Sequence, residues 1–125
     1  MSKDVINAEK LGTPVGPYSY GVRFGGLQFL SGQIGRDPES GKLVTGGVAE
    51  ETKQVFKNLK EVLAGAGKTL NDALAVRVFL TDMADFSAMN AVYAEHFTQP
   101  YPARTTVAVA ALPMGASVEI DLIAR

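Results

Sequence analysis

The sequence predicts an α+β fold in two layers, in which a mixed β-sheet carries two helices on one face. Two segments repeat apolar residues at the three- and four-residue intervals of amphipathic helices, and several others alternate with the period of two that is typical of strands. Segments rich in glycine and proline separate them. The expected order is strand, strand, helix, strand, helix, strand, strand, and the uncovered face of the sheet favours association with further copies of the chain.

Length and composition fit one globular domain over residues 1–125, with 46% hydrophobic residues to build its core. The 12 basic and 13 acidic residues give a net charge of -1, so charge gives no reason to expect a nucleic acid or membrane partner. The absence of cysteine excludes disulfides, thiolate nucleophiles and cysteine metal sites. No apolar run approaches the roughly 18 residues of a membrane span, and the N-terminus does not resemble a signal peptide, so we expect a cytoplasmic protein.

The first part of the chain contains a predicted hairpin and two candidate binding segments. Gly25-Gly26 connects two short apolar runs and can supply the positive φ angles of a tight turn. Before the hairpin, Tyr18 lies in the segment Gly-Pro-Tyr-Ser-Tyr-Gly, where it can face a pocket or cap the core. After the hairpin, Ser31-Gly32 can present a hydroxyl and free amides to a ligand or mark a bulge. These residues alone leave both alternatives open.

The middle of the chain predicts a helix and then a buried strand. From Gly47 onward, apolar residues recur at helical intervals, and charged residues of both signs fill the opposite, solvated face. Gly65 or Gly67 can supply the left-handed residue that ends this helix. The continuous apolar run of residues 73–80 is typical of a buried strand.

A second helix is expected after this strand. Asn90 follows Phe86 by four residues, so its amide also faces inward and must find partners or serve a pocket. The single histidine, His96, has no second ligand at helical spacing, so no metal site is expected. The inner apolar stripe of the helix comprises Phe86, Met89, Tyr93 and Phe97.

Arg104 lies where an extended segment becomes a strand. Pro100 and Pro102 favour a straight approach, and the alternating, β-branched residues that follow predict a strand. A guanidinium held there presents a rigid fork of donors that fits a carboxylate in bidentate fashion. A solvated arginine at a strand end is the alternative.

The last predicted strand carries two carboxylates on one face. Val118, Ile120 and Leu122 share one side, while Glu119 and Asp121 share the other. The two carboxylates therefore face the same side of the sheet. They either act as acid or base, or they belong to a solvated outer face.

Taken together, these residues resemble the RidA/YjgF family of reactive-intermediate deaminases, which act on enamines and imines. The resemblance covers nearly the whole chain, and the order and spacing of its pieces are more specific than any piece alone. It rests on Gly-Pro-Tyr-Ser-Tyr-Gly at 16–21, Ser-Gly-Gln-Ile at 31–34, Asn90 with Tyr93, Pro-Ala-Arg-Thr at 102–105, and Val-Glu-Ile-Asp-Leu-Ile-Ala at 118–124.

The resemblance implies a chorismate-mutase-like fold, a homotrimer with pockets between neighbouring subunits, and cofactor-independent hydrolysis of imino acids such as 2-aminoacrylate or 2-iminopropanoate. It implies that Arg104 pairs with the substrate carboxylate, that Tyr18 lies near the reacting end, and that Glu119 orients or deprotonates water. Further implied substrate contacts are Ser31, Gly32, Asn90 and Thr106. An imine is already electrophilic, so the site need only hold it and supply water and a proton.

The chain departs from many relatives at two places. Thr106 stands where many have cysteine, and Gly35-Arg36 stands where many have a proline after Ser-Gly-Gln-Ile. Neither change removes the carboxylate contact, but both affect which side chains the pocket prefers. The alternatives are a trimeric metabolite-binding or regulatory protein without catalysis and, less favoured by the balanced charge, an RNA-cleaving translation inhibitor.

Overall fold

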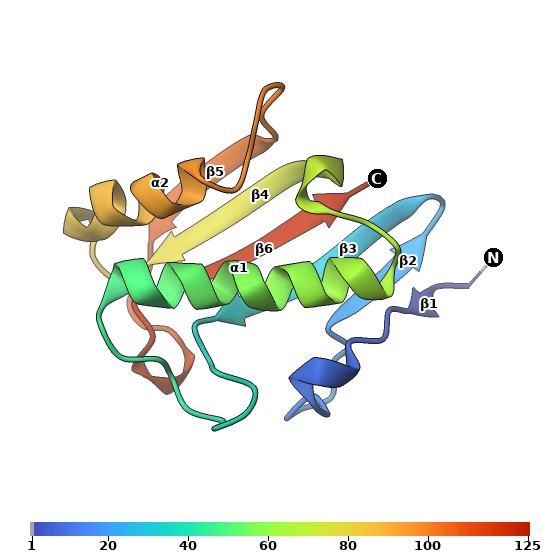
Figure 1. Cartoon of the computed structure of the whole chain (residues 1–125), viewed down its shortest axis with the longest axis horizontal. Coiled ribbons are helices and arrows are strands. Elements are labelled where there is room, and N and C mark those ends of the chain that lie inside the picture. Colours follow the sequence, from blue (N-terminus) through green and yellow to red (C-terminus); the bar gives the residue numbers. More distant parts are fainter. Residues whose placement is uncertain (1) are drawn as a thin grey trace.

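Six strands form one mixed sheet, and both α-helices lie against the same face of it (Figure 1). The computed structural model describes residues 2–125. In the order β1-β2-β3-β6-β4-β5, all neighbours are antiparallel except the parallel pair β4–β5. The elements are β1 (Asp4–Val5), β2 (Gly21–Phe24), β3 (Leu27–Ile34), α1 (Val48–Gly65), β4 (Ala73–Leu80), α2 (Phe86–Ala94), β5 (Ala103–Ala108) and β6 (Val118–Ala124).

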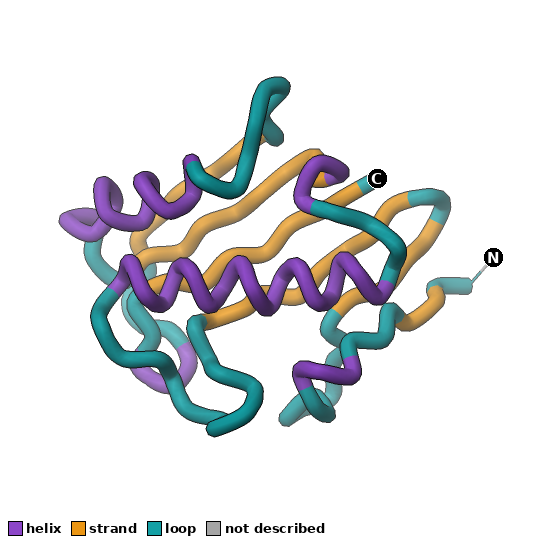
Figure 2. The backbone as a smooth tube through the Cα atoms, in the orientation of Figure 1, coloured by secondary structure: helices purple, strands orange, loops and turns teal. Residues whose placement is uncertain are grey.

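The two helices are crossover connections. Helix α1 joins β3 to β4, which lie on either side of β6, and α2 joins β4 to its parallel neighbour β5. Parallel strands need such crossovers, and placing both on one side leaves the other side open. Figure 2 shows the long loop that leads from β3 into α1. The α+β prediction with two helices on one face is confirmed.

The strand register determines which residues face the helices. Val76 and Val78 are buried under the helices, and they pair with Arg104 and Thr106 of β5, so these two residues share the helix-covered face. Glu119 pairs with Phe79 and therefore lies on the open face.

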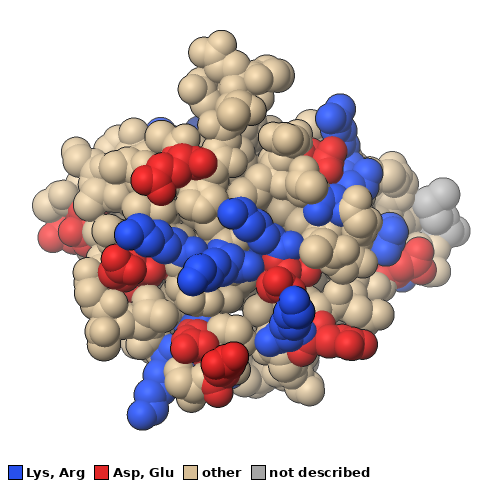
Figure 3. Space-filling view, viewed as in Figure 1, with Lys and Arg blue, Asp and Glu red and all other residues tan. Residues whose placement is uncertain are grey.

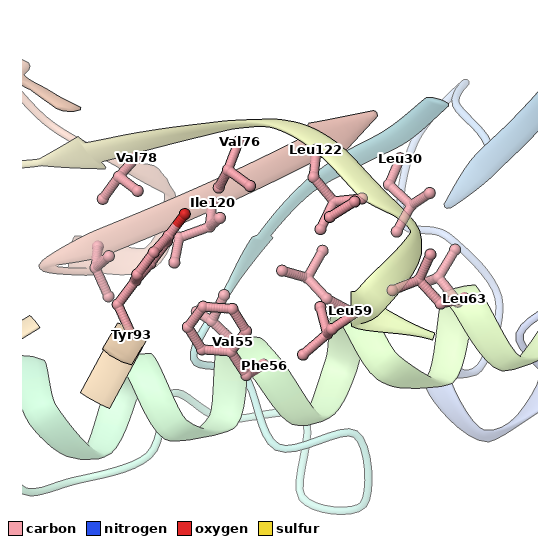
Figure 4. Close-up of a cluster of buried hydrophobic side chains, with 14 of the residues drawn as sticks. Leu30, Val55, Phe56, Leu59, Leu63, Val76, Val78, Tyr93, Ile120 and Leu122 are labelled. Carbon is pink, nitrogen blue, oxygen red and sulfur yellow. The ribbon is translucent and has the colours of Figure 1, made fainter. Parts of the chain in front are cut away.

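The core lies between α1 and the sheet (Figure 4). Phe56 is fully buried, and its ring packs against the rings of Tyr93, His96 and Phe97. Each fully buried side chain of this kind stabilises the fold by about 1.5–3 kcal/mol. The sheet contributes Leu30, Val76, Val78, Ile120 and Leu122, and α1 contributes Val55, Phe56, Leu59 and Leu63.

The open face combines exposed apolar side chains with one ion pair. Phe29 is 38% exposed and Val107 is 41% exposed. Between their strands, Arg77 Nε donates to Asp121 Oδ1 at 2.9 Å, and Nη2 donates to Oδ2 at 2.6 Å. Nothing in residues 2–125 covers this face, which agrees with the expectation drawn from the pattern.

Glycine conformations confirm the predicted hairpin and helix end. Gly25 and Gly26 have φ angles of 59° and 82°, as the turn between β2 and β3 requires. Gly67 has φ of 71° and follows the end of α1, where its amide donates to Ala64 O at 3.0 Å. Gly65 instead allows the backbone at Asn7 to approach α1 closely, because a side chain at Gly65 would overlap the Asn7 carbonyl.

Four details differ from the sequence-based expectation. Strand β1 was not predicted, because two residues are too few to show a period. Strand β3 continues to Ile34 instead of ending at Leu30, through the bulge that was one of the two alternatives for Ser31 and Gly32, which face the single residue Asp121. Helix α2 ends at Ala94, so Phe97 is buried beyond the helix. The approach to β5 bends at residues 99–100 rather than running straight, because the chain must turn back from α2 to reach the sheet edge.

Candidate functional site

The predicted site residues form two groups that lie at separate places in the folded chain. The first is the arginine cluster at the junction of α2 and β5. The second is the glutamate pocket, a cavity of about 180 Å³ near the ends of β3 and β6. The arginine cluster comprises Phe86, Asn90, Tyr93, Arg104 and Thr106, and the glutamate pocket includes Tyr18, Gly32 and Glu119.

Arg104 is oriented by three contacts with α2. Its Nη1 donates a hydrogen bond of 2.6 Å to Asn90 Oδ1. Its guanidinium carbon lies 4.5 Å from the ring centroid of Tyr93 and 5.5 Å from that of Phe86, within the range of cation–π attraction. The side-chain oxygen of Asn90 thus finds its hydrogen-bond partner in Arg104. Within residues 2–125 no carboxylate lies within 4.0 Å of this guanidinium, so its charge is unpaired in the chain.

Two hydroxyl groups near Arg104 also lack hydrogen-bond partners within residues 2–125. They are the buried Tyr93 Oη, which points from α2 toward the sheet (Figure 4), and the buried Thr106 Oγ1. Burial raises the pKa of Tyr93, and the nearby charge of Arg104 lowers it to a smaller extent.

Glu119 lies directly over Gly32 in the glutamate pocket. A side chain on Gly32 would overlap the carboxylate, so glycine is what lets Glu119 lie across the bulge. Burial raises the pKa of Glu119, and the neighbouring charge of Asp121 raises it further. Asp121 is neutralised by Arg77, whereas within residues 2–125 no cation lies within 4.0 Å of Glu119. A half-buried carboxylate with a raised pKa is a candidate to accept and donate a proton.

Tyr18 faces the pocket, and Tyr20 performs the core-capping role. Tyr18 is 46% exposed, and its ring meets the edge of Tyr20 at a centroid distance of 6.2 Å. Tyr20 is buried, and its hydroxyl donates to Leu11 O at 3.0 Å. Ser31 Oγ donates to Ser19 O at 2.6 Å, which fastens the Tyr18 segment to the bulge. The Ser31 hydroxyl proton is therefore engaged in holding the segment in place.

Sequence reasoning missed several residues that line the pocket. Arg36 was noted only as a departure from relatives, and its position in the loop after β3 gave no periodicity to place it. The positive φ of Met114, at 59°, could not be read from its residue type, although the neighbouring Gly115 indicated a turn. The apolar part of the lining comprises Leu11, Val15, Ile34, Pro113 and Met114.

The sheet separates the two groups within one chain. Arg104 pairs with Val76, whereas Glu119 pairs with Phe79, three positions further along β4 and on the opposite face. At about 3.3 Å per residue and about 4.8 Å between strands, their backbones lie roughly 10 Å apart in each direction of the sheet. A small ligand therefore cannot contact both side chains of the same chain.

Residues 2–125 contain neither a cluster of metal-binding side chains nor a membrane-spanning helix. No three histidine, aspartate or glutamate side chains in this range gather closely enough to bind a metal ion. Each helix in the same range is too short or too polar to span a lipid bilayer.

The fold and the two groups of residues define an α+β protein with one open sheet face, and comparison with known proteins identifies its family. The family model described as Endoribonuclease L-PSP matches residues 9–125. A mouse 2-iminobutanoate/2-iminopropanoate deaminase is 46% identical over 122 residues, which cover 98% of this chain and 90% of the relative. The chain therefore belongs to the RidA/YjgF family, which also carries the L-PSP description.

Solved structures agree with this assignment. RidA from the Antarctic bacterium Psychrobacter sp. PAMC 21119 matches with a TM-score of 0.91 and 42% identity, covering 97% of this chain and 98% of that one. E. coli TdcF with bound serine matches with a TM-score of 0.89 and 34% identity, covering 97% of both chains. The six-stranded mixed sheet with two helices is thus the arrangement of RidA structures.

Proposed function

We propose that this protein hydrolyses 2-imino acids and their enamine tautomers to 2-keto acids and ammonia, with no cofactor. The observation that carries the proposal is the 46% identity, over nearly the whole chain, to a mouse protein named for this deaminase activity. The unpaired, oriented Arg104 supports it, because every such substrate carries a carboxylate.

The proposed site forms between two copies of the chain in a homotrimer. The arginine cluster of one copy meets the glutamate pocket of its neighbour, which brings Arg104 and Glu119 to one ligand. Three features support this assembly: the two residues lie on opposite faces of one sheet, the open face exposes Phe29 and Val107, and β5 is an edge strand.

In this site Arg104 binds the substrate carboxylate through two parallel hydrogen bonds. The Asn90 contact and the Tyr93 ring fix the fork in advance, so little side-chain entropy is lost on binding. The TdcF structure contains serine, whose α-carboxylate is of the type that Arg104 would bind. Thr106 Oγ1 lies two residues further along β5 and is a candidate donor to the same ligand.

The reaction needs one water molecule and proton transfers. An enamine first gains a proton at its terminal carbon and becomes the imine. Water then adds its oxygen to the imine carbon, the C=N bond becomes a single bond, and Glu119 accepts a proton from the water. Glu119 returns that proton to the nitrogen of the tetrahedral intermediate. The remaining hydroxyl then gives its proton to Glu119 as the C=O bond forms, the C–N bond breaks and ammonia leaves, and Glu119 releases the proton to solvent. The raised pKa of Glu119 makes its carboxylate a stronger base and so favours the step in which it accepts the proton from water.

A coupled assay tests the proposal. An amino-acid oxidase generates imines from several amino acids, and their disappearance is followed with and without the protein. We expect accelerated hydrolysis of 2-iminobutanoate and 2-iminopropanoate. Hydrolysis at the background rate, together with a melting temperature raised by 2-keto acids, would instead favour a metabolite-binding protein without catalysis.

RNA cleavage is a second candidate, because the matching family model is described as an endoribonuclease. The charge distribution argues against it, since basic and acidic side chains are interspersed over the helix-covered face in Figure 3. Lys53, for example, pairs with Glu50 at 3.2 Å. RNA binding that weakens steeply with salt, with cleavage that survives Arg104→Ala, would favour this alternative.

A further inference from the structure

Arg36 is an arginine of this chain that lines the glutamate pocket, in addition to the Arg104 that the proposed neighbouring copy would supply. It follows β3 and lines the pocket together with Tyr18, Tyr20 and Glu119. One of its terminal nitrogens, Nη2, lies close to Gly41, in the turn that forms the pocket rim. The charge of Arg36 also affects Tyr20. Burial and Tyr18 raise the pKa of Tyr20, and Arg36 lowers it to a smaller extent.

The backbone that carries Arg36 is fixed from both sides. The buried side chain of Asn58, on α1, donates from Nδ2 to Ile34 O at 3.3 Å and to Arg36 O at 3.0 Å. Between these carbonyls, Gly35 packs so closely on Glu51 that a side chain there would overlap the α1 backbone. Arg36 also forms a bridge with Leu43 across the loop. The guanidinium is therefore presented from a rigid position, as a binding residue requires.

The charge of Arg36 has no partner within residues 2–125. Its side chain is half-buried, yet no carboxylate in this range lies within 4.0 Å and no hydrogen bond satisfies its donors. The adjacent carboxylate of Asp37 is used in the turn, where Oδ1 accepts from the Glu39 amide at 2.9 Å. A half-buried cation without a partner is costly unless a ligand or solvent compensates it.

The pocket between Arg36 and Glu119 is mostly apolar. Arg36 and Glu119 line the same cavity, and no salt bridge within 4.0 Å joins them. Val15, Ile34 and Met114 supply apolar wall to this cavity. A ligand that reacts beside Glu119 would therefore extend a hydrocarbon side chain along this wall, toward the Arg36 guanidinium.

From this arrangement we infer that Arg36 is a specificity-determining residue that binds a second carboxylate, at the end of the substrate side chain. The preferred substrates are then 2-imino acids whose side chain ends in a carboxylate. This inference rests on the proposed function, since it deepens the same site. Arg104 of the neighbouring copy holds the α-carboxylate, and Arg36 holds the distal one.

A matched pair of substrates tests the inference. Oxidation of glutamate gives 2-iminoglutarate, and oxidation of norvaline gives 2-iminopentanoate, which has the same chain length without the second carboxylate. We expect Arg36→Met, which keeps an unbranched stem without the charge, to lower kcat/KM for 2-iminoglutarate by about tenfold or more. The value for 2-iminopentanoate should stay within about twofold, and Arg36→Lys should recover part of the loss.

Three results would overturn the inference. The first is an equal loss of kcat/KM on both substrates, and the second is no loss of kcat/KM on either. The third is dissociation of the oligomer in Arg36→Met, which would assign Arg36 to subunit contacts. Melting temperatures of both variants show whether the fold is intact.

A binding measurement separates this inference from the proposed function. Calorimetry with 2-oxoglutarate and 2-oxopentanoate requires no catalysis. If the parent protein hydrolyses no imine, the deaminase proposal fails, and the role of Arg36 stands only if Arg36→Met weakens 2-oxoglutarate binding by about tenfold and leaves 2-oxopentanoate unchanged. Equal affinity of parent and variant for 2-oxoglutarate would refute it.

Discussion

Arg104 and Glu119 lie on opposite faces of the same sheet, although only β4 separates their strands. Arg104 is held under α2 by Asn90, and Glu119 lies across Gly32 on the open side. If both serve one substrate, they must come from different copies of the chain. This requirement makes the proposed trimer testable through catalysis as well as through size.

Mixing two inactive variants tests the shared site. Arg104→Ala and Glu119→Gln should each be nearly inactive alone, but a trimer that contains both can place an intact Arg104 against an intact Glu119. Random mixing in equal amounts restores about a quarter of the sites in a cyclic trimer. Activity is measured after co-refolding, with each variant refolded alone as the control. Failure to recover activity in proven mixed trimers, or a monomer by light scattering, would contradict the shared site.

Among the proposed site residues, we expect substitution of Arg104 to weaken substrate binding most. Removing one partner of a charge-paired contact to a ligand costs on the order of 2–5 kcal/mol, which is tens- to thousands-fold in kcat/KM. We expect Arg104→Ala to show this loss and Arg104→Lys to recover little, because lysine lacks the planar fork.

The matched control for Arg104 is Arg23→Ala, which removes an exposed arginine from β2. It should hydrolyse imines at the parent rate. Hydrolysis by Arg104→Ala at close to the parent rate would show that the substrate carboxylate is bound elsewhere.

Gly32 should be needed for activity more than for folding. A methyl group at this position would overlap the end of the Glu119 side chain, which can move aside, rather than a rigid backbone. We therefore expect Gly32→Ala to remain folded, with a melting temperature near that of the parent, and to lose about tenfold to a hundredfold in kcat through the displaced carboxylate. A fully active Gly32→Ala would show that the observed position of Glu119 is not the catalytic one.

The site residues came from the family resemblance and stay predictions, whereas the sequence predicted the sheet and both helices because local periodicity and turn chemistry report on each element separately. It could not predict which residues meet. The strand order β3-β6-β4-β5 is set by pairings between distant segments, and only that register shows Thr106 and Glu119 on different faces. Tyr20 rather than Tyr18 is the buried ring, and its hydroxyl donates to the distant Leu11 carbonyl, a contact that no local pattern reveals.

Glu119 should make stability depend on pH. Its pKa in the folded chain is raised from the ordinary value of 4.5, by burial and then by Asp121. The folded state therefore binds the proton more tightly than the unfolded state, and this contribution to stability is present below 4.5 and lost as pH rises through the folded pKa. Ionised Glu119 thus lowers stability at neutral and alkaline pH.

The variant Glu119→Gln carries no charge at this position, so it removes the loss of folding stability that ionised Glu119 causes. We expect its melting temperature to exceed that of the parent near pH 8 and the difference to shrink near pH 4, while kcat falls by about 10²- to 10⁴-fold. The exposed Glu95→Gln provides the control and should show neither effect. A difference that grows toward acid would mean that the ionised carboxylate is stabilised in the fold.

Tyr93 should support Arg104 through its ring rather than its hydroxyl. Tyr93 Oη is buried without a partner in residues 2–125, so Tyr93→Phe removes an uncompensated polar group and should stabilise the fold by about 1 kcal/mol in urea unfolding. The ring lies 4.5 Å from the Arg104 guanidinium and is retained in Phe, so KM should change by less than about twofold.

Tyr93→Leu keeps a buried apolar side chain but removes the aromatic face beneath Arg104. The lost cation–π contact, worth about 0.5–2 kcal/mol, should leave Arg104 less well oriented and raise KM several-fold, with a smaller change in kcat. Melting temperatures separate this effect from the packing loss. If Tyr93→Phe impaired KM as much as Tyr93→Leu, the hydroxyl would be the group that acts on the ligand, and its missing partner in the chain would be the substrate.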